Sequence, residues 1–179
     1  SRSIQVSLQQ GGTVDKDAFV KLFDYVFWAD RRFMDCVDAL SEEQYRQHID
    51  FSQGAISQHL VHLIGVEYWW IHFLRTGELD FADESVFLMP REQIRAKYAE
   101  VEREVRAYLD TLTPEELGRH VKPGFWDEEE EPIAVWQALL QVVNHSTDHR
   151  AQAMAMMHTQ FGAPTMEQDF LNYLEEAGS

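Results

Sequence analysis

Apolar residues recur at steps of three and four along much of this chain, which is the spacing of one face of an α-helix. The spacing predicts four long helices, over residues 14–40, 53–76, 91–112 and 133–161. Short helices are expected after Ser41 and Thr113, which suit N-capping, and over residues 169–176. Between residues 120 and 132 the spacing stops, which predicts an irregular loop or a small hairpin. The pattern therefore indicates an all-α protein, a four-helix bundle with short extra helices.

No internal repeat, linker or low-complexity tract divides the chain, whose 179 residues are enough to bury one full core. We expect residues 13–179 to form a single domain and residues 1–12 to form a flexible N-terminal lead-in. Residues 77–90 are expected to form a loop that carries two aromatic side chains, Phe81 and Phe87.

The last long helix is apolar on two sides, which is unusual for a helix at the surface of a bundle. Ala138, Val142 and Met156 lie opposite the stripe that contains Leu139 and Val143. One stripe suffices for the core, so the other needs a cleft wall or a second subunit to cover it. We therefore predict a homodimer.

One carboxylate, Glu67, falls inside the apolar stripe of the second long helix. A buried carboxylate needs a partner, so a cation or several hydrogen-bond donors should face it. Arg150 is a candidate for that partner.

The chain has 15 Lys and Arg against 31 Asp and Glu, a formal net charge of −16. This charge argues against nucleic acid and anionic membranes as partners. No apolar run approaches the roughly 20 residues that a membrane span requires. The single cysteine, Cys36, excludes an internal disulfide, and its position in a helical stripe suits a buried apolar side chain rather than a nucleophile. We expect a cytoplasmic protein.

The candidate chemistry lies in the last long helix, where His145 and His149 are four residues apart. Side chains at this spacing share one side of a helix, with Cβ atoms about 5–6 Å apart, so both imidazoles can bind one divalent metal ion. A catalytic metal site commonly needs a third ligand. The second long helix offers His59, His62 and His72, and the spacing alone leaves the choice open. The alternative is that the pair are ordinary surface or core histidines.

Several further segments match a known family. Residues 22–32 read LFDYVFWADRR, with Asp30 where that family often has Asn, and His62 is followed by Glu67 and Trp70 at its usual spacing. The segment 144–152, NHSTDHRAQ, is followed by further matching positions at Gly162, Pro164, Asp169, Phe170 and Tyr173. The chain resembles the DinB/YfiT-like superfamily of bacterial metal-binding four-helix bundles over most of its length.

The resemblance implies an up-and-down bundle with a non-standard connection between the second and third long helices. It also implies a divalent metal ion, Zn or Ni with Fe or Mn as alternatives, held by His62, His145 and His149. Gln152 would then either orient a bound ligand or only cap the cleft. The remaining histidines, His48, His72, His120 and His158, are expected to be surface or structural, and the acidic run at 127–131 a solvated loop rather than a Ca²⁺ site.

Members of this superfamily include transferases that use small bacterial thiols. The resemblance therefore implies a metal-dependent thiol S-transferase acting on small electrophiles, in a stress or detoxification role, with a low-molecular-weight thiol as partner. A metal-dependent hydrolase is the second hypothesis, because a metal ion also lowers the pKa of a bound water to about 7. A non-catalytic metal-binding protein is the third, and it predicts a metal site with no substrate cavity beside it.

Overall fold

A computed structural model describes residues 15–81 and 89–178 of the chain. The expected lead-in over residues 1–12 and the side chain of Phe87 lie outside the described residues. Four long helices are present: α1 (Lys16–Asp38), α3 (Ile56–Thr76), α4 (Arg91–Asp110) and α6 (Val135–Phe161). The shorter elements are α2 (Glu42–Arg46), α5 (Pro114–Gly118), β1 (His120–Val121), β2 (Ile133–Ala134) and α7 (Phe170–Ala177). This confirms the predicted all-α four-helix bundle.

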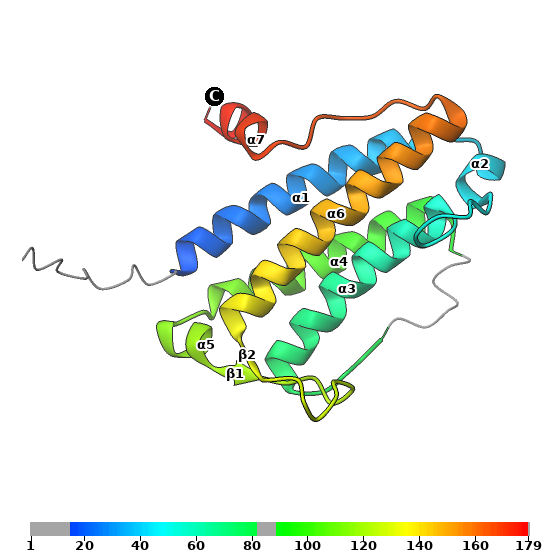
Figure 1. The fold of residues 1–179 in the computed structure, drawn as a ribbon. Helices are drawn as coiled ribbons and strands as arrows, with labels where there is room; N and C mark the ends of the chain where they lie inside the picture. The colour runs from blue at the N-terminus through cyan, green and yellow to red at the C-terminus, as the bar shows by residue number, and fades with distance from the viewer. Residues whose placement is uncertain (1–14, 82–88, 179) are drawn as a thin grey trace, which may run out of the picture.

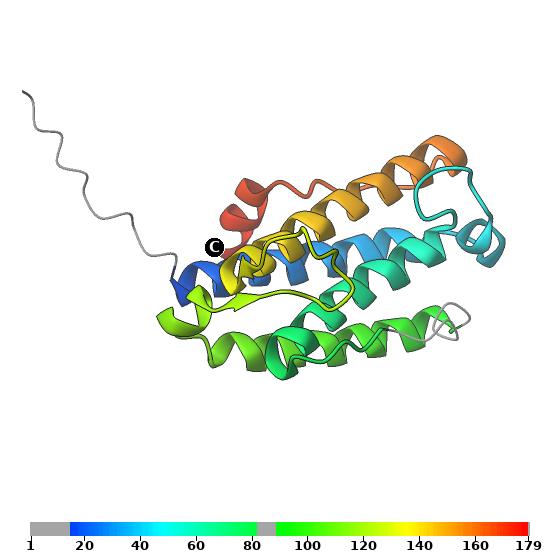
Figure 2. The same cartoon turned by 60° about the horizontal axis from the view of Figure 1, so that its bottom comes forward.

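The long helices form a ring in which α1 and α3 each pack against both α4 and α6. Helices α3 and α4 run in the same direction, opposite to α1 and α6 (Figures 1 and 2). The guanidinium of Arg91, at the start of α4, donates to the carbonyl of Val37 at the end of α1 over 3.0 Å. At the other end of the bundle, Arg119 reaches the carbonyl of Leu74 in the last turn of α3, over 2.6 Å. The connection between α3 and α4 must therefore span the length of the bundle, as the resemblance implied.

Local chemistry explains where these helices begin and end. Ser41 caps α2 in a reciprocal box with Gln44, which satisfies backbone donors that have no partner within the helix. Gly77 and Gly162 end α3 and α6 in the left-handed region, with φ of 78° and 62°, which glycine adopts without a Cβ clash. Residues 133–134, which the spacing placed in the last helix, instead pair with 120–121 as a two-stranded hairpin.

Both apolar stripes of α6 are buried within a single chain. Leu139 on one stripe, and Ala138 and Val142 on the other, have no exposed surface. The reason is that α6 packs between α1 and α3, so one stripe faces each neighbour. The second stripe thus needs no second subunit to cover it. The homodimer stays a prediction, but the second stripe no longer supports it.

An ion pair between helices lies in the centre of this apolar core. Arg150 is fully buried and Asp30 is 1% exposed. The guanidinium Nη1 of Arg150 donates to Asp30 Oδ1 over 2.6 Å, and the hydroxyl of Tyr98 donates to Asp30 Oδ2 over 2.5 Å. Gln168 Oε1 accepts a further bond from Arg150 Nε over 3.0 Å. These contacts join α1, α4, α6 and the segment before α7.

Glu67 is fully buried, as predicted, but its direct partner differs from the expected one. Ser146 Oγ donates to Glu67 Oε1 over 2.8 Å, while Arg150 pairs with Asp30. Burial, and then the charge of Asp30, hold the pKa of Glu67 well above its ordinary value. This favours the protonated acid, which costs far less to bury than a carboxylate. We call Asp30, Glu67, Tyr98, Ser146 and Arg150 the buried polar network.

Among the described residues, no helix combines the length and apolar character needed to cross a membrane.

We expect Arg150→Met to lower the free energy of unfolding by about 3–5 kcal/mol, because it leaves the carboxylate of Asp30 buried and without its cation. Arg106→Met is the matched control. Arg106 also pairs with acids, Asp24 and Glu102, but its side chain is 42% exposed, so its loss should cost under about 1 kcal/mol. Urea unfolding of the metal-free proteins measures both values. Equal losses for the two variants would contradict a special role for the buried pair.

Candidate metal centre

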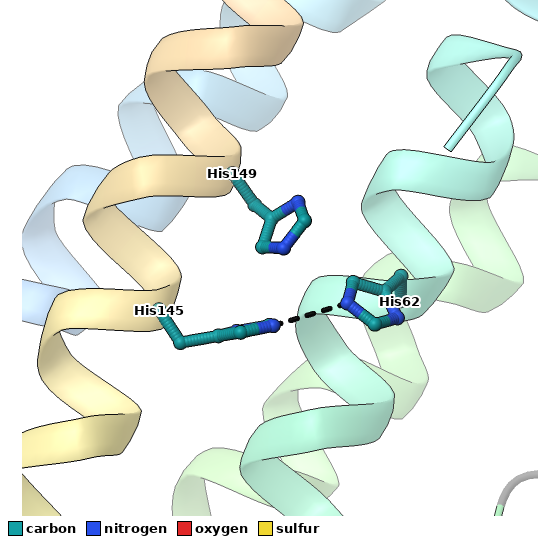
Figure 3. Close-up of side chains that lie close together, drawn as sticks. All are labelled: His62, His145 and His149. Carbon is teal, nitrogen blue, oxygen red and sulfur yellow. Dashed lines mark hydrogen bonds between the residues drawn. The ribbon is translucent and has the colours of Figure 1, made fainter. Parts of the chain in front are cut away.

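Three imidazoles from two antiparallel helices converge at one point in the groove between α3 and α6. His62 comes from α3, and His145 and His149 come from successive turns of α6 (Figure 3). The Nε2 atoms of His62 and His145 are 3.0 Å apart, and one potential ligand atom from each of the three residues lies within 4.8 Å of the others. The ring centroids of His145 and His149 are 4.3 Å apart, as their spacing of four residues predicts.

These distances suit a shared metal ion. Imidazole nitrogens bind Zn²⁺ at about 2.0–2.1 Å, so two of them on one tetrahedral ion lie roughly 3.3–3.4 Å apart. The observed 3.0 Å between His62 and His145 is close to that value, and the ligand atoms of all three residues lie within 4.8 Å of one another. A set of three imidazoles suits several first-row divalent ions, including Zn and Ni. The residues present therefore fit the metal that the sequence resemblance implied.

The protein holds the candidate ligands in their neutral form. Burial, followed by the neighbouring His149 and His62, lowers the pKa of His145 to about 3. Burial is also the first cause that lowers the pKa of His62 and of His149. Neutral imidazole is the form that binds metal. The Nδ1 atoms of His145 and His149 are buried and have no hydrogen-bond partner within the described part of the chain, although metal-bound histidines usually have one there.

A fourth histidine, His59, lies next to the cluster. It is 1% exposed, and its ring centroid is 5.8 Å from that of His149. Neither of its ring nitrogens has a partner among residues 15–81 and 89–178, and burial lowers its pKa to about 4. The sequence left His59, His62 and His72 as alternatives for the third ligand. The fold brings His62 into the cluster, keeps His59 buried beside it, and places His72 against Tyr68 instead.

The other polar candidates do not belong to the cluster of three imidazoles. The amide of Gln152 donates to Asp148 Oδ2 over 2.8 Å and accepts from the hydroxyl of Ser52. Gln152 thus ties the loop before α3 to α6, which matches a capping role. The acidic run at 127–131 is exposed in the hairpin loop, as expected of a solvated segment. His48, His120 and His158 are exposed as well.

A cavity of about 800 Å³ opens directly beside the cluster, with His62 and His145 in its lining. Gln137 and Gln141 of α6 line it too, and they form one row with His145 because they precede it at steps of four. This spacing was visible in the sequence. Five aromatic side chains from separate parts of the chain also line the cavity, and we call them the aromatic wall: Trp69, Trp70, Phe81, Phe125 and Trp126. Periodicity could not reveal that these rings meet, because the hairpin and the segment after α3 carry no helical pattern.

Comparisons with known proteins agree with this architecture. The model of the DinB family matches residues 10–178. A crystal structure of a DinB-like protein from Bacillus cereus superposes with a TM-score of 0.60 at 20% sequence identity, covering 84% of this chain and 97% of that one. At this identity the likeness concerns the fold. No curated protein matches the chain by sequence.

We expect His59→Leu to leave the free energy of unfolding of the metal-free protein unchanged or to raise it by about 1 kcal/mol. A buried polar group without hydrogen bonds costs about 1–3 kcal/mol, and an apolar side chain of similar size removes that cost. His72→Leu on the same helix is the control and should change stability by under about 0.5 kcal/mol. Urea unfolding at pH 7.5 with a chelator gives both values. A loss above about 1 kcal/mol in His59→Leu would mean that its nitrogens are satisfied in solution.

Proposed function

The chain belongs to the DinB family, and from that premise we propose that it is a metal-dependent thiol S-transferase acting on small electrophiles. His62, His145 and His149 would hold the divalent metal ion, Zn or Ni with Fe or Mn as alternatives. The observation that carries the proposal is the convergence of three neutral imidazoles beside a cavity large enough for a small organic molecule.

The ligand set determines what the site offers chemically. Three neutral imidazoles leave the charge of a divalent ion uncompensated, and they leave at least one position open on a four-coordinate ion. When bound, such an ion lowers the pKa of a thiol enough to supply thiolate near neutral pH. The cavity beside His62 and His145 gives a second molecule access to the same point.

The sulfur that reacts must come from a bound molecule. The only cysteine, Cys36, is buried in α1, and burial raises the pKa of its thiol, which makes it a poor nucleophile. In the proposed reaction the sulfur of a small thiol forms a bond to carbon of the electrophile. The leaving group departs with its electron pair, and the thiol proton passes to solvent. The cavity is what favours this function over a purely metal-binding protein.

Metal binding is tested by elemental analysis of the untagged protein. We expect close to one ion per chain in the parent and less than a tenth of that in a His62→Ala, His145→Ala double variant, because a single remaining imidazole binds weakly. A His72→Ala, His158→Ala double variant removes two histidines outside the cluster and should keep the full metal content. A parent that stays metal-free after reconstitution with Zn, Ni, Mn and Fe would overturn the proposal.

Catalysis is tested with the metal-loaded protein, cysteine as the thiol and 1-chloro-2,4-dinitrobenzene as the electrophile. We expect thioether formation above the uncatalysed rate, and a fall to that rate in the His62→Ala, His145→Ala variant or after chelation. A panel of esters without thiol is run in parallel. Metal-dependent ester cleavage with no thiol transfer would replace the transferase by a hydrolase, and inactivity in both assays over wider thiol and electrophile panels would leave a binding protein.

A further inference from the structure

The aromatic wall exposes apolar surface beside the candidate metal centre. Phe81 is 55% exposed and Phe125 is 53% exposed, yet they belong to one cluster of rings. The centroid of Trp69 lies 5.6 Å from that of Phe81 and 5.7 Å from that of Phe125. Trp69 also stacks on Trp70 at 4.3 Å. Removing apolar surface from water is favourable, so a molecule that covers these rings would be bound favourably.

The absence of charge among the described lining residues indicates what charge that molecule should carry. None of the described residues that line the cavity is Lys, Arg, Asp or Glu, although the whole chain carries a net charge of −16. A carboxylate or phosphate held against the aromatic wall would lose its hydration without gaining a cation. An ammonium group could contact the faces of the aromatic rings, but it would find no carboxylate among the described lining residues. The lining therefore suits an uncharged occupant.

Apart from His62 of α3, the histidine and glutamine residues of the described lining lie along one helix, α6. Gln137, Gln141 and His145 form the row along α6, and the side chain of Gln137 already accepts from the backbone N–H of Ala134 over 2.8 Å. Gln141 makes no side-chain hydrogen bond within residues 15–81 and 89–178, so its amide is available to a ligand. A volume of about 800 Å³ is within the usual range for sites that bind drug-sized molecules.

We propose that this cavity selects an uncharged aromatic molecule as the electrophilic substrate, with its rings on the aromatic wall and its reacting end toward His62 and His145. The assignment of the occupant as substrate rests on the proposed function. The binding preference itself rests only on the cavity. The thiol would approach from the side of the imidazoles, because none of the described residues that line the cavity is charged and the proposed metal ion would be held at the imidazoles.

The test uses a matched pair of ligands, 2-naphthamide and 2-naphthoate, which differ mainly in charge. Isothermal titration calorimetry is carried out on the metal-free full chain with chelator present. We expect 2-naphthamide to bind at least tenfold more tightly than 2-naphthoate. Tighter binding of 2-naphthoate, or of 2-naphthylmethylammonium, would overturn the inference, as would the absence of any binding.

The variant Phe125→Ala tests whether 2-naphthamide binds in this cavity, and Phe51→Ala is the matched control. Both side chains are similarly exposed, at 53% and 55%, but only Phe125 lines the cavity, and neither is a core residue whose loss should unfold the chain. We expect at least fivefold weaker binding of 2-naphthamide to Phe125→Ala and a change under twofold for Phe51→Ala. The molar mass of both variants in solution is measured by light scattering. An altered molar mass for Phe125→Ala with unchanged ligand affinity would overturn the assignment, because the ring would then contact a second copy.

The two proposals fail in different ways. Metal content and thiol transfer without binding of 2-naphthamide would reject the aromatic substrate class and leave the transferase standing. Selective binding of 2-naphthamide to a protein that takes up no metal would reject the transferase and leave a binding site for uncharged aromatic molecules.

Discussion

The ion pair between Asp30 and Arg150 is the interaction on which the arrangement of the helices depends. Both side chains are buried, and the cost of burying two charges is offset only when their geometry and their other hydrogen bonds are satisfied. Apolar stripes tolerate small sliding and rotation of one helix against another, whereas this pair is satisfied in one register. Tyr98 extends the same constraint to α4.

The buried polar network and the candidate ligands alternate along the same two turns of α6. Ser146 directly follows His145, and Arg150 directly follows His149. Successive residues on a helix point about 100° apart, because one turn takes 3.6 residues. The bond from Ser146 to Glu67 and the pair with Asp30 therefore also set the direction of the two imidazoles. The buried polar network thus helps to hold His145 and His149 in place at the candidate metal centre, and none of its members belongs to the cluster of three histidines.

We expect the histidine cluster to lower the stability of the metal-free bundle, because it contains buried nitrogens that have no hydrogen-bond partner among the described residues. His59 is buried without a hydrogen-bond partner among the described residues, and His62 and His145 satisfy one another only through a single shared proton. An ion that binds the folded state alone would stabilise it by mass action, joining α3 to α6 at that point. Retaining such unpaired buried nitrogens is typical of a protein that accepts a cost in stability for binding.

The sequence by itself determined the helices, because a 3.6-residue period requires only local information. It also determined the pairing of His145 with His149, and it identified Glu67 as a buried acid from its place in an apolar stripe. Helical spacing left His59 and His62 open, and the family resemblance favoured His62. Only the tertiary structure showed that His62 joins the pair, because the rotation of one helix against another separates these two residues of α3. The same is true of the choice of Asp30 for Arg150, and of the aromatic wall, where Phe81 and Phe125 meet from segments without any period. These features depend on the relative placement of elements that are distant in the chain, and local spacing carries no information about that placement.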